Sequence, residues 1–172
     1  VCYAKGKGCA ENVKEAFIWT KKAAEQENMF AQNFLAGLYA NGLGCEKKLA
    51  EAFSWYKKSA GHDYDEAQYR LALCYWNGEG CEKNIDEAFN WFYKAALQGH
   101  KEAQYKLGIM YFNGYGTQQN YKEAFEWCKK AADKGLPEAI YDIGICYYSG
   151  IVVEKNLQEA FSYFKKAAEL GV

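Results

Sequence analysis

The tripeptide Glu-Ala-Phe recurs five times in the 172-residue chain, and each copy follows the previous one after 36 residues. An aromatic residue stands two positions after each Phe, and an alanine stands seven positions after it. A fixed period without insertions is typical of a repeat array, so the chain is expected to use one small folding unit several times. The copies start at Glu15, Glu51, Glu87, Glu123 and Glu159.

A second pattern fills the other half of each period. In residues 65–80 it places Ala67, Leu71, Ala72 and Tyr75 along one stripe of a helix and ends with two loop glycines. Spacings of three and four residues also run through the Glu-Ala-Phe segment, and strict alternation is absent. Each repeat is therefore predicted to be a helical hairpin. In the best-defined copy, a first helix covers about 66–77 and a second helix about 85–98.

Residues suited to helix ends support these boundaries. In four copies an Asn stands three residues before the Glu, which is typical of an N-cap. Lys48 takes this position in the remaining copy, whose second helix should lose about 1 kcal/mol of cap stabilisation. Pro137 falls in the first turn of a first helix, where a missing N–H is tolerated. The predicted caps are Asn12, Asn84, Asn120 and Asn156.

Neither helix can bury its apolar stripe alone, so neighbouring repeats must stack into an all-α array. The predicted units are a partial repeat at 1–28, which is mainly a second helix, and full repeats at 29–64, 65–100, 101–136 and 137–172. Tyr3, Gly6 and Gly8 are the last part of a first-helix pattern. Neither end carries an evident polar cap. We therefore expect the array to continue in a longer parent chain or to self-associate through its ends.

The charge balance argues against polyanionic partners. Lys and Arg together number 21, Asp and Glu 22, and the formal net charge is −1. The protein therefore has no global field that would attract nucleic acid. No apolar run is long enough to cross a bilayer and no signal peptide is recognisable, which predicts no direct membrane insertion.

The seven cysteines do not form a regular disulfide pattern. Residues at equivalent positions of stacked repeats lie about 10 Å apart, which is too far for a disulfide. The number is also odd, so we predict reduced, partly buried thiols and favour a cytoplasmic location. His62 and His100 are expected at the surface. One repeat position holds Cys9, Cys45 and Cys81, another holds Cys2, Cys74 and Cys146, and Cys128 replaces an aromatic residue.

Motifs for catalysis are missing from the sequence. It contains no phosphate-binding loop, no nucleophile elbow and no Cys/His or Ser/His pair at a usable spacing. The loop glycines recur in the other repeats, which identifies them as structural turns. No four residues converge as zinc ligands. The prediction is a protein without catalytic residues, metal or cofactor.

The combined pattern resembles the Sel-1-like repeats, which are longer relatives of tetratricopeptide repeats, and the resemblance covers essentially the whole chain. It implies a right-handed superhelical solenoid of antiparallel helix pairs with the first helices on the inner wall. It also implies a scaffold or adaptor role, as in membrane-protein degradation, cell-wall synthesis regulation and bacterial host interaction. Three positions depart from the pattern: Val152 replaces the second loop glycine, and Glu27 and Asp63 replace closing glycines.

In related repeats, residues of the first helices line a concave groove that binds peptides. Here the equivalent positions combine aromatic residues, amides and acids, which suits recognition of a protein segment. For Tyr69, Tyr105 and Tyr141 packing on the next first helix is an equal alternative. The groove is favoured for Trp76, Phe112 and Tyr148. The predicted groove residues are Glu66, Tyr69, Leu73, Trp76, Asn77, Glu102, Tyr105, Ile109, Phe112, Asn113, Glu138, Tyr141, Ile145, Tyr148 and Ser149.

Two other functions fit the same repeats. The array could be a structural spacer or oligomerisation arm of a larger protein. It could also be a secreted ligand-binding or cell-wall-binding module, as in the cysteine-rich bacterial branch of the family. That branch has one disulfide in each hairpin, and the uneven cysteine positions here count against it.

Overall fold

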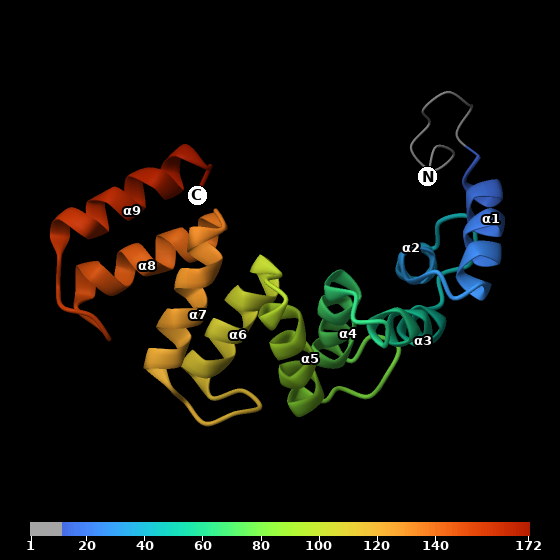
Figure 1. Ribbon diagram of the computed structural model, residues 1–172, viewed down its shortest axis with the longest axis horizontal. Helices are drawn as coiled ribbons and strands as arrows, with labels where there is room; N and C mark the ends of the chain where they lie inside the picture. Colours follow the sequence, from blue (N-terminus) through green and yellow to red (C-terminus); the bar gives the residue numbers. More distant parts are fainter. Residues whose placement is uncertain (1–11) are drawn as a thin grey trace. The chain divides into compact units, whose positions relative to one another are not determined.

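The computed structural model describes residues 12–172, and within this range the chain forms nine α-helices and no β-strand (Figure 1). The chain divides into two compact units, with the boundary between Asn84 and Ile85. Tyr3, Gly6, Gly8, Cys2 and Cys9 lie outside the described residues. The predicted all-α repeat fold is confirmed.

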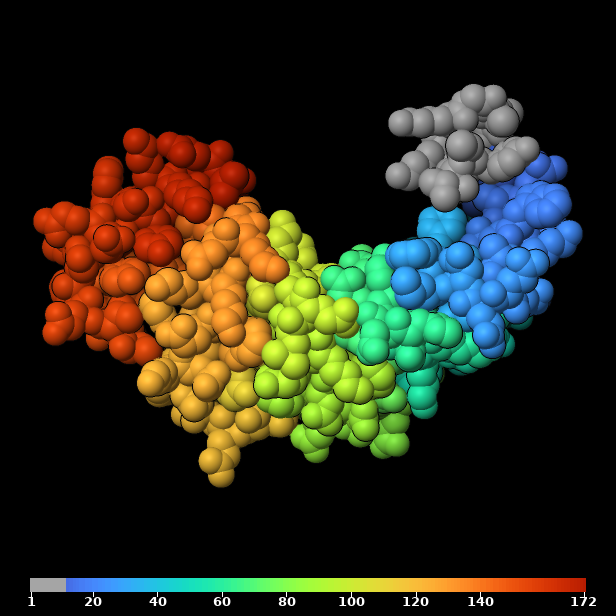
Figure 2. All heavy atoms as spheres, in the orientation of Figure 1, coloured from blue at the N-terminus to red at the C-terminus, as the bar shows by residue number. Residues whose placement is uncertain are grey.

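The unit before Ile85 contains the helices α1 (Val13–Glu25), α2 (Met29–Asn41), α3 (Leu49–Ala60) and α4 (Asp65–Asn77). The other unit contains α5 (Ile85–Leu97), α6 (Lys101–Asn113), α7 (Tyr121–Asp133), α8 (Pro137–Ser149) and α9 (Leu157–Glu169). Even-numbered helices are the predicted first helices and odd-numbered helices are the second helices. Inside each unit, helices that follow one another in the chain pack together, as the sequential colours of Figure 2 also show.

The helix ends form where the sequence predicts them. The side chains of Asn12, Asn120 and Asn156 each accept the N–H of the Glu three residues later, at 3.1 Å. Lys48 makes no such bond, which confirms the uncapped start of α3. Pro137 is the first residue of α8. The departures Glu27, Asp63 and Val152 adopt positive φ angles of 61°, 56° and 70° although none of them is glycine.

Ring contacts join consecutive repeats. In each case the Phe of a Glu-Ala-Phe segment meets the Tyr of the next first helix nearly edge to face. This contact explains why the Phe and the Tyr both recur every 36 residues. The ring centroids are 5.2 Å apart for Phe17–Tyr39 and Phe53–Tyr75, 5.5 Å for Phe89–Tyr111 and 6.2 Å for Phe125–Tyr147.

The exposed side of most second helices carries a stacked cation. A Lys three residues after the Trp places its ammonium nitrogen over the indole ring, which stabilises the helix surface by cation–π attraction. The arrangement recurs because the Trp and the Lys both return at the 36-residue spacing of the repeats. The nitrogen-to-centroid distances are 4.4 Å for Lys22–Trp19, 4.1 Å for Lys58–Trp55, 3.9 Å for Lys94–Trp91 and 3.7 Å for Lys130–Trp127.

The described cysteines are free thiols: Cys45, Cys74, Cys81, Cys128 and Cys146. The thiols of Cys45 and Cys81 donate to carbonyl oxygens of the preceding first helix, at 3.8 and 3.6 Å. Their place in the loop therefore has a structural explanation. Among residues 12–172 no three His, Cys, Asp or Glu residues gather as a metal site would require. None of the helices described is long and apolar enough to cross a membrane.

The second loop glycine allows the close approach of consecutive repeats. Gly80 has a φ of 76°, and a Cβ added to it would overlap the carbonyl oxygen of Leu49 at the start of α3. Gly44 and Gly116 hold the same position against Val13 and Ile85. Glycine is needed here for both its conformation and its size.

Replacing Gly80 by alanine should therefore destabilise the protein more than replacing Gly78. Gly78 has nearly the same φ, 75°, but its nearest neighbours are 3.4 Å or more from an added Cβ. Gly78→Ala should reduce the free energy of unfolding by about 1 kcal/mol, the cost of a left-handed alanine. Gly80→Ala should reduce it by at least about 2 kcal/mol because the repeats must also move apart. Urea unfolding followed by circular dichroism measures both, and equal losses would contradict the packing role of Gly80.

Candidate functional site

Two pockets lie at the same place in the repeat. One, of about 280 Å³, lies among α6, α7 and α8; the other, of about 410 Å³, lies among α2, α3 and α4. Ten of the eleven residues around the second pocket have a counterpart 72 residues later around the first. Each pocket is thus formed by one hairpin and the first helix of the next repeat, so the array itself generates the site.

The pocket among α6, α7 and α8, which we call the apolar pocket, is enclosed mainly by aliphatic and aromatic side chains. Its residues include Ile109, Phe112, Phe125, Ile143 and Ile145, with Cys128 and Asp142 as polar members. The loop after α8 contributes Ile151 and Val152. Such a surface suits the apolar side chain of a ligand.

The pocket among α2, α3 and α4, which we call the polar pocket, has a different chemistry. Arg70 replaces the counterpart Asp142, Tyr56 replaces Cys128, and Lys47 and Glu79 add charges. Burial raises the pKa of the Tyr56 hydroxyl to about 12, so this group stays protonated near neutral pH. The same position of the repeat therefore presents two chemically distinct surfaces.

The structure brings some of the predicted groove residues together in these pockets. Leu73 and Asn77 line the polar pocket. Ile109, Phe112, Asn113, Ile145 and Ser149 line the apolar pocket. Neither pocket includes Glu66, Tyr69, Trp76, Glu102, Tyr105, Glu138, Tyr141 or Tyr148.

The predicted aromatic residues differ in their surroundings. Phe112 and Tyr148 are 50% and 58% exposed, whereas Tyr69 and Trp76 are half-buried. Tyr105 takes the packing position that was the alternative, because its hydroxyl donates to Asp142 Oδ2 on the next first helix at 2.9 Å. The Tyr141 ring is exposed and lies 5.4 Å from the Phe164 ring, between centroids.

The amides predicted to hold a bound segment, and the Ser149 hydroxyl at the equivalent position, also form bonds within their own helix or with the loop after it. Asn113 Nδ2 donates to the Ile109 carbonyl at 2.9 Å, and Ser149 Oγ donates to the Ile145 carbonyl at 2.7 Å. Asn77 Nδ2 donates to Glu79 Oε1 at 3.0 Å. An amide carries two N–H donors and one oxygen acceptor, so these bonds use only part of its capacity.

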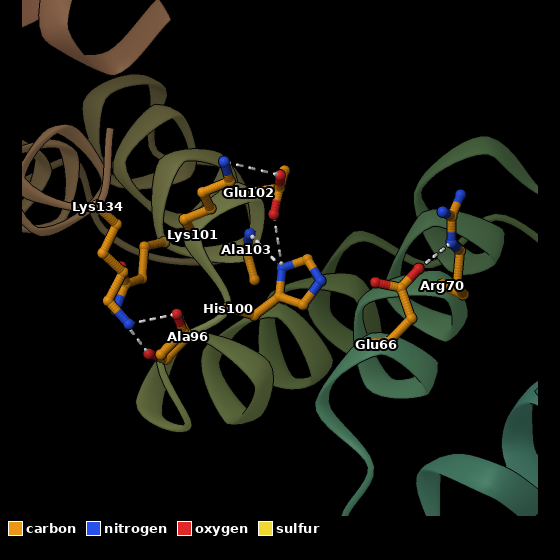
Figure 3. Close-up of polar contacts among 10 residues, drawn as sticks. Glu66, Arg70, Ala96, His100, Lys101, Glu102, Ala103 and Lys134 are labelled. Atoms are coloured by element: carbon orange, nitrogen blue, oxygen red, sulfur yellow. Dashed lines mark hydrogen bonds and ion pairs between the residues drawn. The ribbon is translucent and has the colours of Figure 1, made fainter. Parts of the chain in front are cut away.

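The predicted acidic residues include two with basic neighbours (Figure 3). Glu66 pairs with Arg70 at 2.7 Å, and Glu102 lies 4.0 Å from Lys101. The surface position expected for His100 is wrong: its side chain is only 8% exposed and caps α6, with Nδ1 accepting the Ala103 N–H at 3.3 Å. This cap could not be recognised from the sequence because His is not a typical N-cap residue.

Sequence reasoning missed Asp142 and Cys128 as members of the site. Each of them occupies a repeat position at which its side chain differs in size or charge from the side chains of the other repeats. Cys128 stands where Tyr56, Phe92 and Phe164 stand elsewhere, and Asp142 stands where Phe34, Arg70 and Lys106 stand. Changes of chemistry at fixed positions were therefore the available signal.

Burial controls the ionisable groups of the apolar pocket. It raises the pKa of the Cys128 thiol to about 12, and it also raises the pKa of Cys146. Both thiols are therefore protonated near neutral pH and are poor nucleophiles. Burial raises the pKa of the Asp142 carboxyl too, and this effect exceeds the opposing effect of the Tyr105 hydrogen bond.

Asp142→Asn should change the pH dependence of stability. Because the folded-state pKa of Asp142 lies above its ordinary value of 3.8, its stabilising contribution is complete below that value. The contribution is lost as the pH rises through the folded-state pKa. Asn keeps an acceptor for Tyr105 without this ionisation. The melting temperature of the variant relative to wild type should therefore rise as the pH increases from about 4 through the folded-state pKa of Asp142.

Glu126→Gln on α7 is the matched control for this measurement, because Glu126 is an exposed carboxylate. Its melting temperature should stay parallel to that of wild type over the same range. Parallel curves for Asp142→Asn as well would contradict the assignment of a raised pKa to Asp142.

Comparisons with known proteins give a consistent result. The Sel1 repeat family matches residues 1–28, 30–64, 65–100, 101–136 and 137–172. A crystal structure of a Sel1 repeat protein from Oxalobacter formigenes is 30% identical, with a TM-score of 0.93 over 99% of this chain and 70% of the other. No curated protein sequence matches the chain.

Two further solved structures are similar. The protein c5321, a protective antigen present in uropathogenic Escherichia coli strains, is 34% identical with a TM-score of 0.94. The match covers 99% of this chain but only 36% of c5321. Helicobacter pylori cysteine rich protein B is 24% identical with a TM-score of 0.59, over 75% of this chain and 92% of that protein. At this identity the likeness concerns the fold alone.

Proposed function

The chain belongs to the Sel1 repeat family, and we propose that it is a non-catalytic scaffold that binds a segment of another protein over its first helices. Proteins of this family are generally protein-interaction scaffolds. The observation that carries the finer proposal is the recurrence of one pocket position in two parts of the array. An array that repeats its surface can offer similar positions to successive parts of an extended ligand.

The chemistry of the pockets supports binding in preference to catalysis. The thiols of the apolar pocket are buried and protonated, and its carboxyl group is engaged by the Tyr105 hydroxyl. Catalysis would require an activated nucleophile or an acid–base pair within reach of a substrate. The two pockets differ in charge, so a ligand that suits one would not suit the other. This difference would give the scaffold specificity.

A capture experiment tests this proposal. The wild-type chain, immobilised and exposed to lysate of its source organism, is compared with a Phe112→Ala/Ile145→Ala variant. Phe112 and Ile145 are exposed first-helix residues of the apolar pocket. Partners bound by wild type should be depleted at least about tenfold from the variant, because apolar anchors carry much of the binding energy. Mass spectrometry quantifies the bound proteins.

Leu97→Ala provides the matched control. Leu97 is an exposed apolar residue at the end of α5, outside both pockets. The control should capture the same partners as wild type, and circular dichroism checks that every variant stays helical. Equal capture by wild type and the double variant, or loss of capture only in Leu97→Ala, would contradict binding over the first helices.

A further inference from the structure

The apolar pocket coincides with two departures from the repeat. Cys128 stands where three sister copies carry Tyr or Phe and the first copy carries Thr20, and Val152 stands where the four other copies carry glycine. The two residues lie on different helical hairpins, 24 positions apart in the chain, yet both line this pocket. Each departure on its own is a local irregularity. Together they change what lines one space, because the polar pocket, whose repeat keeps Tyr56 and the loop glycine Gly80, is not smaller.

The first departure removes an aromatic ring. In the last repeat the Phe164 ring lies against Gly144 of its own first helix, 2.8 Å from the place of an added Cβ. In the repeat at 101–136 the Cys128 sulfur lies against the equivalent Gly108. A thiol is much smaller than a phenyl ring, so at this position the pocket is lined by a thiol and not by an aromatic face.

The second departure places a branched side chain in the loop after α8, and this side chain lines the pocket. A Cβ at the sister positions Gly80 and Gly116 would meet the backbone at the start of the preceding second helix. Val152 carries such a Cβ and holds a φ of 70°, which is unfavourable for a β-branched residue. Its loop therefore cannot pack as closely as the glycine loops. Tyr121, Ile151 and Val152 all line the pocket.

The resulting pocket has the size and charge for a particular occupant. Its volume of about 280 Å³ exceeds the roughly 150 Å³ of an apolar cavity that binds benzene. Of the described residues around it, none is Lys or Arg, and Asp142 alone is acidic. The Tyr105 hydroxyl donates to one carboxyl oxygen of Asp142, and a carboxylate can accept further bonds. A cationic donor would complement it.

We infer that the apolar pocket receives one aromatic side chain of the bound protein segment, with a Lys or Arg of the same segment placed against Asp142. The inference rests on the proposed function and adds the chemistry of the partner. The ring packs against Cys128, the position at which three sister copies carry a Phe or Tyr of their own. The polar pocket, which keeps Tyr56 and carries Arg70, does not accept the same pair of groups.

A random-peptide display library selected on the full chain tests this inference. Enriched peptides should combine an aromatic residue with a nearby Lys or Arg. Cys128→Phe restores the ring of the sister copies and should weaken binding of these peptides at least about 30-fold, as expected for a central anchor. Leu97→Phe adds a ring at an exposed position outside both pockets and is the matched control, with binding close to wild type. Asp142→Asn should weaken the binding of peptides that contain Lys or Arg more than the binding of analogues with Gln in place of the basic residue.

A second readout does not depend on any variant. Methyl NMR of the wild-type chain should show enriched peptides shifting Ile109, Ile143 and Ile145, which line the pocket, and leaving Ile18 on α1 unchanged. Equal binding to wild type and Cys128→Phe, or enriched peptides without an aromatic residue, would overturn the pocket inference while the scaffold proposal stands. Failure to select any binding peptide would count against both.

Discussion

The contact between the Phe of one second helix and the Tyr of the next first helix is the interaction on which the array depends. It recurs at Phe17, Phe53, Phe89 and Phe125, always with a nearly perpendicular ring pair between consecutive repeats. The loop glycine beside it sets how closely those repeats approach. Because both pockets lie at such junctions, the residues that stabilise the stack also determine where a ligand could bind.

Much of the fold could be predicted because the same residue pattern occurs several times in the chain. Helix starts at Asn12 and Asn120, the uncapped start at Lys48 and the first-turn position of Pro137 all follow local rules. The positive φ angles of Glu27, Asp63 and Val152 do not follow from residue type. They follow from position in the repeat, since packing of the neighbouring helices imposes on these residues a conformation that glycine adopts elsewhere.

The candidate site was less predictable because it combines residues from both helices of one repeat and from the loop of the next. The first-helix pattern identified Ile109, Phe112 and Ile145, which line the apolar pocket. It did not identify Cys128, which the sequence shows only as a departure, and nothing local connects Cys128 with Val152. Tyr105 and Asp142 likewise meet only after two consecutive first helices have packed. A site formed by such meetings depends on three-dimensional structure, whereas helix ends depend on near neighbours.

The most direct test of the account is a crystal structure of the chain with a captured partner segment. The account predicts that the segment lies over the first helices and has a side chain in the apolar pocket between Ile109 and Ile145. It also predicts that the Phe–Tyr ring pairs stay intact, because binding uses the existing junctions. A segment bound instead to the second helices, over Trp19 or Trp91 and their stacked lysines, would contradict the central claim.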